Sequence, residues 1–280
     1  MTTRTPPRAA LVRAAVVRTG WALVAAVPLV AHAHKPFLVP SETVLSARGW
    51  ITVDAAVSND LFYFNHQPLR IENNLRIIGP DGGAVEAANL NTGKFRTTFD
   101  VNLTASGTYK LAMVNNSLQA TYEADNGERK RWRGTAATFA GEVPANAQNL
   151  QVSQTQTRIE TFVTSGKPND TAFKATGTGL ELVPVTHPND LVAGEPATFR
   201  FVLDGKPAAG IKVMVVPGGT RYRNKQSEQH VVSGNDGQVS LTWSDPGMYW
   251  LEARVEDDKA MKPATTRRAS YIATLEVLPP

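Results

Sequence analysis

The sequence contains no cysteine in its 280 residues. Without cysteine the chain cannot be held together by disulfides, so its stability must come from a packed core. The chain also lacks a cysteine nucleophile, a G-x-S-x-G elbow, a P-loop and a dinucleotide-binding fingerprint. Spacing does not single out a Ser-His-Asp set among the five histidines. These absences predict that the protein is not an enzyme.

Long apolar runs are missing too, except for one near the N-terminus. Residues 21–31 are apolar, and the four arginines that precede them are accompanied by no acidic residue. Such a run is shorter than the roughly 20 residues that a membrane-spanning helix needs, and it is typical of a signal peptide. Small residues at Ala31 and Ala33 predict removal of residues 1–33, with cleavage after Ala31 as the alternative. We expect a periplasmic mature chain without a membrane span.

The excess of positive charge does not survive this cleavage. The whole chain has a net charge of +4 at pH 7, and the predicted leader carries four arginines and no acid. The mature chain therefore has no net charge, and no basic face remains of the kind that binds nucleic acid. We expect no nucleic-acid partner.

After the leader, β-strand patterns replace helical ones. Segments of alternating or β-branched apolar residues predict strands over 51–57, 75–78, 95–103, 108–114, 155–164, 180–185, 197–203, 211–216, 237–243, 248–255 and 272–277. Residues 115–148 are polar and charged, which predicts a long excursion between strands. Asp245–Tyr249 has the D-x-G-x-Y form of a tyrosine corner, and Gly107–Tyr109 is a looser echo of it.

These patterns predict an all-β fold, with two tandem immunoglobulin-like β-sandwich domains behind a cleaved N-terminal signal helix. About 247 residues remain after the leader, which is enough for two ordinary domains. The expected boundaries are a signal peptide at 1–33, an N-terminal domain with a metal site at 34–172, and a C-terminal domain at 173–280.

The histidine at the cleavage point is the most informative residue. Cleavage after Ala33 gives His34 a free terminal amine, which loses its proton to a metal more easily than a lysine does, and which chelates together with the ring nitrogen. Cleavage after Ala31 leaves His32-Ala33-His34, which offers an amine, two amides and an imidazole in one plane. Square-planar nitrogen sites suit Cu(II) or Ni(II), with Co(II) as a further candidate. The alternative is a mobile His34 that binds nothing.

His66 is the expected second ligand. It closes the aromatic-rich segment 60–66 at a strand end. Aromatic walls keep an imidazole neutral and able to bind a metal, and Asn65 and Asp60 are candidate acceptors for its other ring nitrogen. The alternative is a histidine that caps a turn before Pro68.

The other histidines and two of the tryptophans have structural interpretations. His187 lies in a His-Pro turn, and His230 is expected to be an exposed strand residue of the second domain. Trp243 and Trp250 are interpreted as core or surface strand residues rather than as a platform for sugars.

The basic run 129–133 has two interpretations. With Trp132 it suits a phosphate or headgroup patch. Asp125 and Glu128 stand beside it, however, and they favour a solvated hairpin tip.

Four segments together resemble a bacterial periplasmic family of unknown function that is grouped with the nickel-uptake substrate-specific components of energy-coupling transporters. They are His34–Pro40, Asp60–His66, Glu160–Thr164 and Gly179–Pro184. In the nickel components the ion is held by nitrogens of the extreme N-terminus and by an interior histidine, so the resemblance implies these roles for His34 and His66. This chain departs from the transporter members because it has no transmembrane helix after the leader, and it would not transport alone. Periplasmic copper-resistance chaperones are similar at the junction, since their mature β-sandwiches start with histidine.

We therefore expect a periplasmic binding protein for nickel, cobalt or copper, which passes the ion to a transporter of the inner or outer membrane or sequesters it. The alternative is an envelope or adhesion module of tandem immunoglobulin-like domains without metal. A third hypothesis is a copper-dependent oxidative enzyme such as a polysaccharide monooxygenase, because those enzymes also begin with histidine.

Overall fold

The computed structural model describes residues 1–2, 34–71 and 73–280. Residues 3–33 of the predicted signal peptide, which include His32, lie outside the described residues. Residues 34–71 and 73–280 belong to one compact unit. Its helices are α1 (Ala136–Glu142) and the 3-10 turns η1 (Thr171–Phe173) and η2 (Thr220–Tyr222). Within the described part of the chain, no helix has the length and apolar character needed to cross a membrane.

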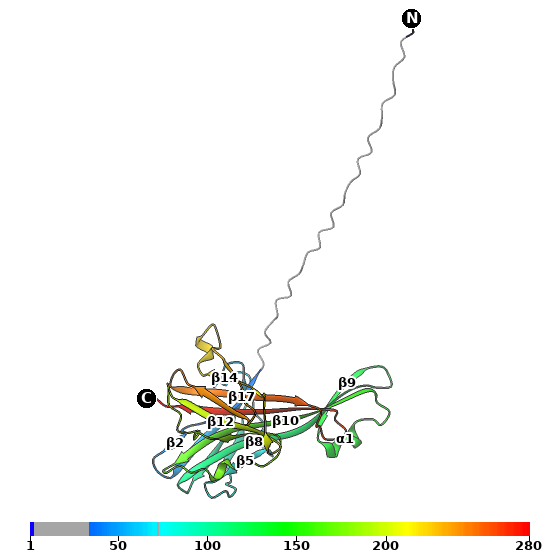
Figure 1. The fold of residues 1–280 in the computed structure, drawn as a ribbon. Helices are drawn as coiled ribbons and strands as arrows, with labels where there is room; N and C mark the ends of the chain where they lie inside the picture. The colour runs from blue at the N-terminus through cyan, green and yellow to red at the C-terminus, as the bar shows by residue number, and fades with distance from the viewer. Residues whose placement is uncertain (3–33, 72) are drawn as a thin grey trace. The chain divides into compact units, whose positions relative to one another are not determined.

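The described unit is built from strands, and the predicted all-β class is confirmed (Figure 1). In chain order the strands are β1 (Lys35–Pro40), β2 (Val44–Leu45), β3 (Gly49–Ser58), β4 (Gln67–Pro68), β5 (Leu75–Ile78), β6 (Ala88–Thr92), β7 (Thr97–Leu103), β8 (Gly107–Glu123), β9 (Arg129–Gly134), β10 (Gln148–Ser165), β11 (Leu180–Pro184), β12 (Pro196–Leu203), β13 (Lys206–Pro207), β14 (Lys212–Pro217), β15 (Gln229–Val232), β16 (Gln238–Thr242), β17 (Gly247–Asp257) and β18 (Thr266–Val277).

The strands form three sheets. The largest has nine strands in the order β15-β14-β17-β18-β10-β8-β5, with β2 on β10 and β9 on β8. A five-stranded sheet has the order β1-β3-β7-β6 with β4 on β3, and a four-stranded sheet has the order β11-β12-β13 with β16 on β12. Strands from both halves of the chain enter the nine-stranded sheet, where β10 pairs in parallel with β18. Backbone hydrogen bonds therefore join the two halves.

Two hydrophobic cores lie on opposite faces of this large sheet. The first core contains Phe37 and Phe99 of the five-stranded sheet, and the second contains Phe199 of the four-stranded sheet. In β17, Trp250 enters the first core and its neighbour Leu251 enters the second. Because successive side chains of a strand point to opposite faces, the nine-stranded sheet is the middle layer between the two smaller sheets.

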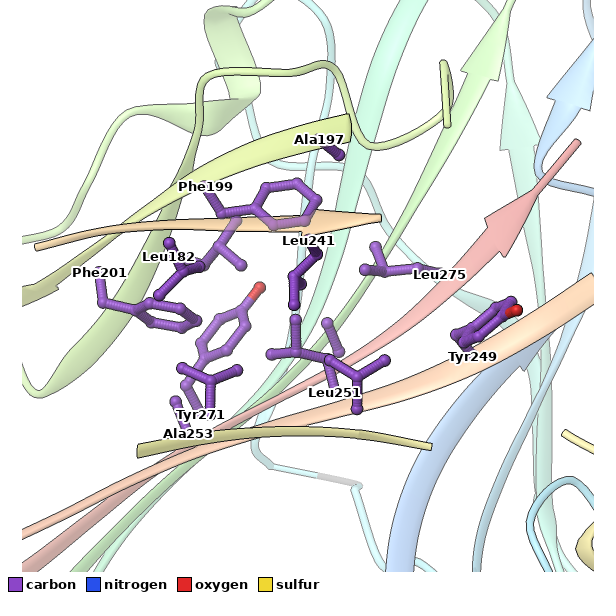
Figure 2. Close-up of a cluster of buried hydrophobic side chains, with 14 of the residues drawn as sticks. Leu182, Ala197, Phe199, Phe201, Leu241, Tyr249, Leu251, Ala253, Tyr271 and Leu275 are labelled. Atoms are coloured by element: carbon purple, nitrogen blue, oxygen red, sulfur yellow. The ribbon is translucent and has the colours of Figure 1, made fainter. Parts of the chain in front are cut away.

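Figure 2 shows the second core. Phe199 and Leu241 of the four-stranded sheet face Leu251, Tyr271 and Leu275 of the nine-stranded sheet. Large side chains such as these contribute roughly 1.5–3 kcal/mol each when they are fully buried. This burial replaces the disulfides that the composition rules out.

A tyrosine corner closes each half. The Tyr249 hydroxyl donates to the carbonyl of Asp245 at 2.8 Å and accepts from its backbone N–H at 3.2 Å. Tyr109 does the same with Ala105, at 3.0 and 2.9 Å. Both hydroxyls lie four residues from their partners, so the predicted corner and its looser echo are the same local structure. Trp243 and Trp250 are both buried in the cores.

The excursion expected over residues 115–148 is largely regular structure, made of strand and one short helix, so that prediction was wrong. β8 continues without a break to Glu123, and β9 pairs back on it before α1 and β10 follow. Polar residues misled the prediction because they occupy one face of this arm. The other face carries a small third core, made of Leu118, Ala120, Tyr122, Val143, Val152 and Ala264.

The domain boundary between residues 172 and 173 stays a prediction. Each half supplies its own small sheet and its own tyrosine corner, as two sandwiches would. The halves nevertheless share one large sheet, so they are fused layers rather than separate modules joined by a linker.

Candidate metal-binding site

Strand β3 brings the two expected ligands together. At its C-terminal end, β3 pairs with β1 on one side, where Lys35 faces Ser58, and with β4 on the other, where Gln67 faces Val57. His34 directly precedes the first residue of β1, and His66 directly precedes the first residue of β4. Both strands run antiparallel to β3, so both histidines start their strands at the same end of the sheet.

The two imidazole rings are stacked across this end. Their centroids lie 3.8 Å apart, and their planes differ by 6°. His34 is exposed and His66 is half-buried. The structure thus places the two predicted metal ligands in direct contact, although they are 32 positions apart in the sequence.

Parallel stacking is not itself a coordination geometry. The lone pair of an imidazole nitrogen lies in the ring plane, so two parallel planes cannot point lone pairs at one ion. One ring must tilt before both can bind the same metal. The exposed His34 side chain is the one free to rotate, because it precedes the first paired residue of β1.

Phenylalanines fix the loop that carries His66. Phe62 and Phe64 pack on the fully buried Phe37 of β1, with centroid distances of 5.4 and 6.1 Å. Phe62 has a φ of 64°, a left-handed conformation that costs a bulky residue roughly 1–2 kcal/mol. The aromatic segment predicted to surround the histidine therefore anchors its loop, and the ring that faces His66 is that of His34.

The polar neighbours of His66 bind one another instead of the imidazole. Asn65 donates to Asp60 at 3.0 Å, and the Ser58 hydroxyl bonds to the side-chain oxygen of Asn65. In the described parts of the chain, neither Asn65 nor Asp60 makes a hydrogen bond to His66. Within the described residues, the ring nitrogens of His66 make no hydrogen bond to the protein.

The second half of the chain supports the same loop. The backbone N–H of Leu61 donates to the Thr220 hydroxyl at 3.0 Å, and the hydroxyls of Tyr63 and Tyr222 bond to each other. Arg221 lies over the Tyr63 ring, 5.1 Å from its centroid. A cleft of about 790 Å³ opens beside these contacts, lined by residues of both halves. Sequence reasoning did not find this cleft, because it joins segments about 160 residues apart.

A buried cation follows His34 directly. Lys35 donates from its Nζ to Gln226 at 2.9 Å and lies 5.7 Å from the centroid of the Trp250 ring. Burial lowers the pKa of Lys35, while the nearby Glu252 carboxylate opposes that shift. Burial also raises the pKa of Glu252, which is paired with Arg254 at 2.7 Å. These contacts hold the start of β1 against β17 and against the loop that contains Gln226.

The remaining histidines lie elsewhere. His187 accepts from the backbone N–H of Asn189 at 3.1 Å through Nδ1, and its Nε2 lies 2.9 Å from the Thr108 hydroxyl. Burial lowers its pKa, which fits the structural role that was predicted for it. His230 is an exposed residue of β15, as expected.

No group of three or more His, Cys, Asp or Glu side chains close enough to hold a metal occurs among residues 34–71 and 73–280. The side chains near the junction supply two imidazoles. The third nitrogen of the expected site is the terminal amine of His34. This amine exists only if the chain is cleaved after Ala33, as predicted.

Solved structures provide distant likenesses. The D0-D1 domain of intimin has 13% identity, a TM-score of 0.23, and coverage of 86% of this chain and 97% of that one. The Yersinia pseudotuberculosis adhesin InvE has 11% identity, a TM-score of 0.22, and coverage of 88% and 60%. Escherichia coli alpha-2-macroglobulin has 11% identity, a TM-score of 0.20, and coverage of 86% and 31%. TM-scores of this size assign neither a partner nor an activity.

Sequence comparison is more decisive about the family. Among curated proteins, none matches the chain. A family model does match, and it covers residues 31–257, from the predicted cleavage region to the end of β17. The matched range includes both stacked histidines and strands of all three sheets. The chain belongs to the DUF4198 family, described as a domain of unknown function.

Proposed function

We propose that the processed protein binds a divalent transition-metal ion in a periplasm-like compartment, with His34 and His66 as ligands. Nickel and copper are the preferred ions and cobalt is a third candidate, because nitrogen-rich sites suit all three. The observation that carries the proposal is the 3.8 Å contact between the two imidazoles. Delivery of the ion to a membrane transporter, rather than storage, is the finer form of the same proposal.

The donor set supports this function once the chain is cleaved before His34. The terminal amine and the imidazole of His34 form one chelate, and the His66 imidazole is within reach after a ring tilt. The imidazole of His66 is held on an anchored loop, so its position costs little entropy on binding. His34 supplies the mobile half of the site.

The experiment starts with the intact mass of the exported protein, which identifies its first residue. Calorimetric titration with Ni(II) and Cu(II) then compares the wild type with His34→Ala, His66→Ala and, as a matched control, His230→Ala. We expect at least a ~100-fold loss of affinity in the first two variants, equivalent to about 2.7 kcal/mol, and no change in the control.

A fourth protein tests the amine. An added glycine before His34 keeps both imidazoles and turns the amine of His34 into an amide. We expect it to bind as weakly as His34→Ala. A mature chain that begins at neither His32 nor His34, or wild-type binding no tighter than ~10 µM, equivalent to about −7 kcal/mol, would sink the proposal.

A second candidate is a metal-free binding module of the cell envelope. The observation that favours it is the cleft of about 790 Å³ between the loops of the two halves, beside the largely exposed Tyr222. This candidate predicts that one identified membrane protein is recovered equally by the wild type and by the His34→Ala, His66→Ala double variant. Its recovery should fall in Tyr222→Ser. Dependence of that recovery on the histidines would favour the metal site instead.

A further inference from the structure

We propose that one face of β9 binds an extended acidic polysaccharide through Arg129, Arg131 and Arg133. Side chains at alternate positions of a strand share a face and are spaced by roughly 7 Å. The three guanidinium groups therefore form a row along β9. In the described residues this row makes no ion pair and no hydrogen bond, although guanidinium groups readily bind carboxylate or phosphate in a two-pronged fashion.

The arm that contains β9 has no net charge, although its arginines are gathered on one face. Residues 119–147 contain four cations and four acids. The acids are mostly engaged away from the arginines: Glu128 pairs with Lys130 at 3.6 Å, and Glu142 accepts from Trp132 at 2.7 Å. Lys130 and Trp132 point to the opposite face of β9, where Trp132 packs on the third core.

The neighbours of Arg131 and Arg133 are neutral polar groups, whereas Arg129 faces Glu123 of β8. Arg131 faces Thr121 and Arg133 faces Gln119 on β8, and Thr121 faces Gln151 on β10. Hydroxyl and amide groups such as these match the hydroxyls of a sugar chain. Among the residues of β8 that follow Ser117 and share this face, Glu123 is the acidic one. Its carboxylate accepts a hydrogen bond from Asn149 at 2.8 Å.

A polar depression lies at one end of the row. Its volume is about 210 Å³, and it is lined by Thr121, Tyr122, Glu123, Arg129, Asn149 and Gln151. One acidic group of the polymer would sit there, beside the Arg129 guanidinium. The proposed binding surface therefore follows β9, with the depression at its Arg129 end.

An anionic membrane surface fits these observations less well. Membrane-binding clusters commonly have four to eight basic residues, whereas this face of β9 has three. The aromatic residue of β9, Trp132, packs on the opposite face, so it cannot enter a bilayer beside the arginines. β9 has no strand partner on its outer side among the described strands, and charges on such an edge also prevent strand pairing. Protection of the edge against strand pairing would not, however, require the three unpaired arginines to lie on the same face of β9.

The test is binding of the full mature protein to alginate, a polyuronate, with neutral dextran as the control polymer. EDTA is present, so that a metal at the histidines cannot bridge protein and polymer, and the outcome is independent of the metal proposal. We expect saturable binding that weakens strongly between 50 and 300 mM salt, because exposed charges are screened over roughly 10 Å or less.

The variants separate the row from general charge. The triple variant Arg129→Gln, Arg131→Gln, Arg133→Gln should bind ~30-fold more weakly, about threefold per arginine, as exposed ion pairs allow. Its matched control removes three other exposed cations, Lys167→Gln, Lys174→Gln and Lys206→Gln, and should bind like the wild type. Glu123→Gln removes an acid from the same face and should bind more tightly.

Three results would overturn the proposal. They are unchanged binding in the triple variant, an equal loss in the lysine control, and binding to vesicles of phosphatidylcholine with phosphatidylglycerol in place of alginate. All the substituted arginines and lysines are exposed, and a shared thermal midpoint confirms that every variant is folded.

Discussion

At the scale of single residues, two tyrosine hydroxyls close the ends of the two halves. The hydroxyl of Tyr249 both donates to and accepts from the backbone of Asp245. Tyr249→Phe would remove both of these part-buried hydrogen bonds, each worth about 0.5–1.5 kcal/mol, so we expect a loss of about 1–3 kcal/mol in the free energy of unfolding. Urea denaturation measures it. Tyr222→Phe removes only an exposed hydrogen bond, the one to the Tyr63 hydroxyl, which water can replace, and it should change stability by less than ~0.5 kcal/mol.

His187 gives the protein a pH-dependent stability. Burial lowers its pKa below the ordinary value of about 6.5, against the attraction of Asp190 and Asp170. The unfolded chain therefore binds more protons at this site than the folded chain. Stability from this residue is complete above pH 6.5 and is lost as the pH falls below that value toward the lowered pKa of the folded state.

The measurement compares the wild type with His187→Gln. Carboxylates that titrate elsewhere affect both proteins alike, so the difference in their unfolding free energies isolates the histidine. We expect the advantage of the wild type at pH 7.5 to shrink at pH 5.5. An advantage that grows on acidification would contradict the assignment of a neutral, buried imidazole.

At the scale of elements, the turn between β15 and β16 depends on Gly237. Its φ is 79°, and an added Cβ would lie 2.3 Å from the carbonyl oxygen of Phe201 on β12. We expect Gly237→Ala to cost at least ~3 kcal/mol, since the strain of a left-handed residue adds to a backbone clash. Gly210 has a φ of 70° but nothing within 4 Å.

Gly210→Ala is therefore the matched control, and it should cost only about 1 kcal/mol. Thermal or urea unfolding of the two variants measures both values. Equal costs would show that the turn at Gly237 can shift away from Phe201.

Element identity was largely predictable from local pattern, whereas element pairing was not. The D-x-G-x-Y corner depends on five consecutive positions, and alternation places β7 and β12 correctly. The parallel pairing of β10 with β18 joins residues more than 110 positions apart, and no local pattern specifies it. The length of β8 was missed because a strand with one solvated face looks like a loop by composition.

The candidate site was predictable by residue type but not by geometry. A histidine at a cleavage point has a chemical reason to bind metal, and His66 was chosen by its aromatic surroundings. The stacking of the two rings follows from the register of β1 and β4 on β3, which the sequence does not encode locally. The arginine row on β9 was judged by its net charge, which hid the separation of charges between faces.

At the scale of the whole molecule, buried ion pairs couple the halves. Arg158 of β10 lies 3.3 Å from Glu160 and 3.3 Å from Glu181 of β11. The Tyr271 hydroxyl of β18 donates to Glu160 at 2.8 Å, and burial raises its pKa well above the ordinary range. These groups are buried between the middle layer and β11 of the four-stranded sheet, where losing one partner of an ion pair costs about 3–5 kcal/mol.

We therefore expect the mature protein to unfold as one cooperative unit. Calorimetry should give a single transition whose calorimetric and van't Hoff enthalpies agree. Arg158→Met should lower the midpoint of that transition without splitting it. Two separate transitions, or a fragment of residues 34–172 that folds alone, would show that the halves are independent domains.

The central position of β18 has a consequence for how the protein is made. β18 pairs with β17 on one side and with β10 on the other, yet it follows every other described strand in the chain. Until residues 266–277 have left the ribosome or the translocation channel, β10 and β17 each present an unpaired edge. The edge of β10 in the first half therefore stays unpaired until the last strand is available. A chaperone that covers exposed strand edges would bind this part of the chain for longest during export.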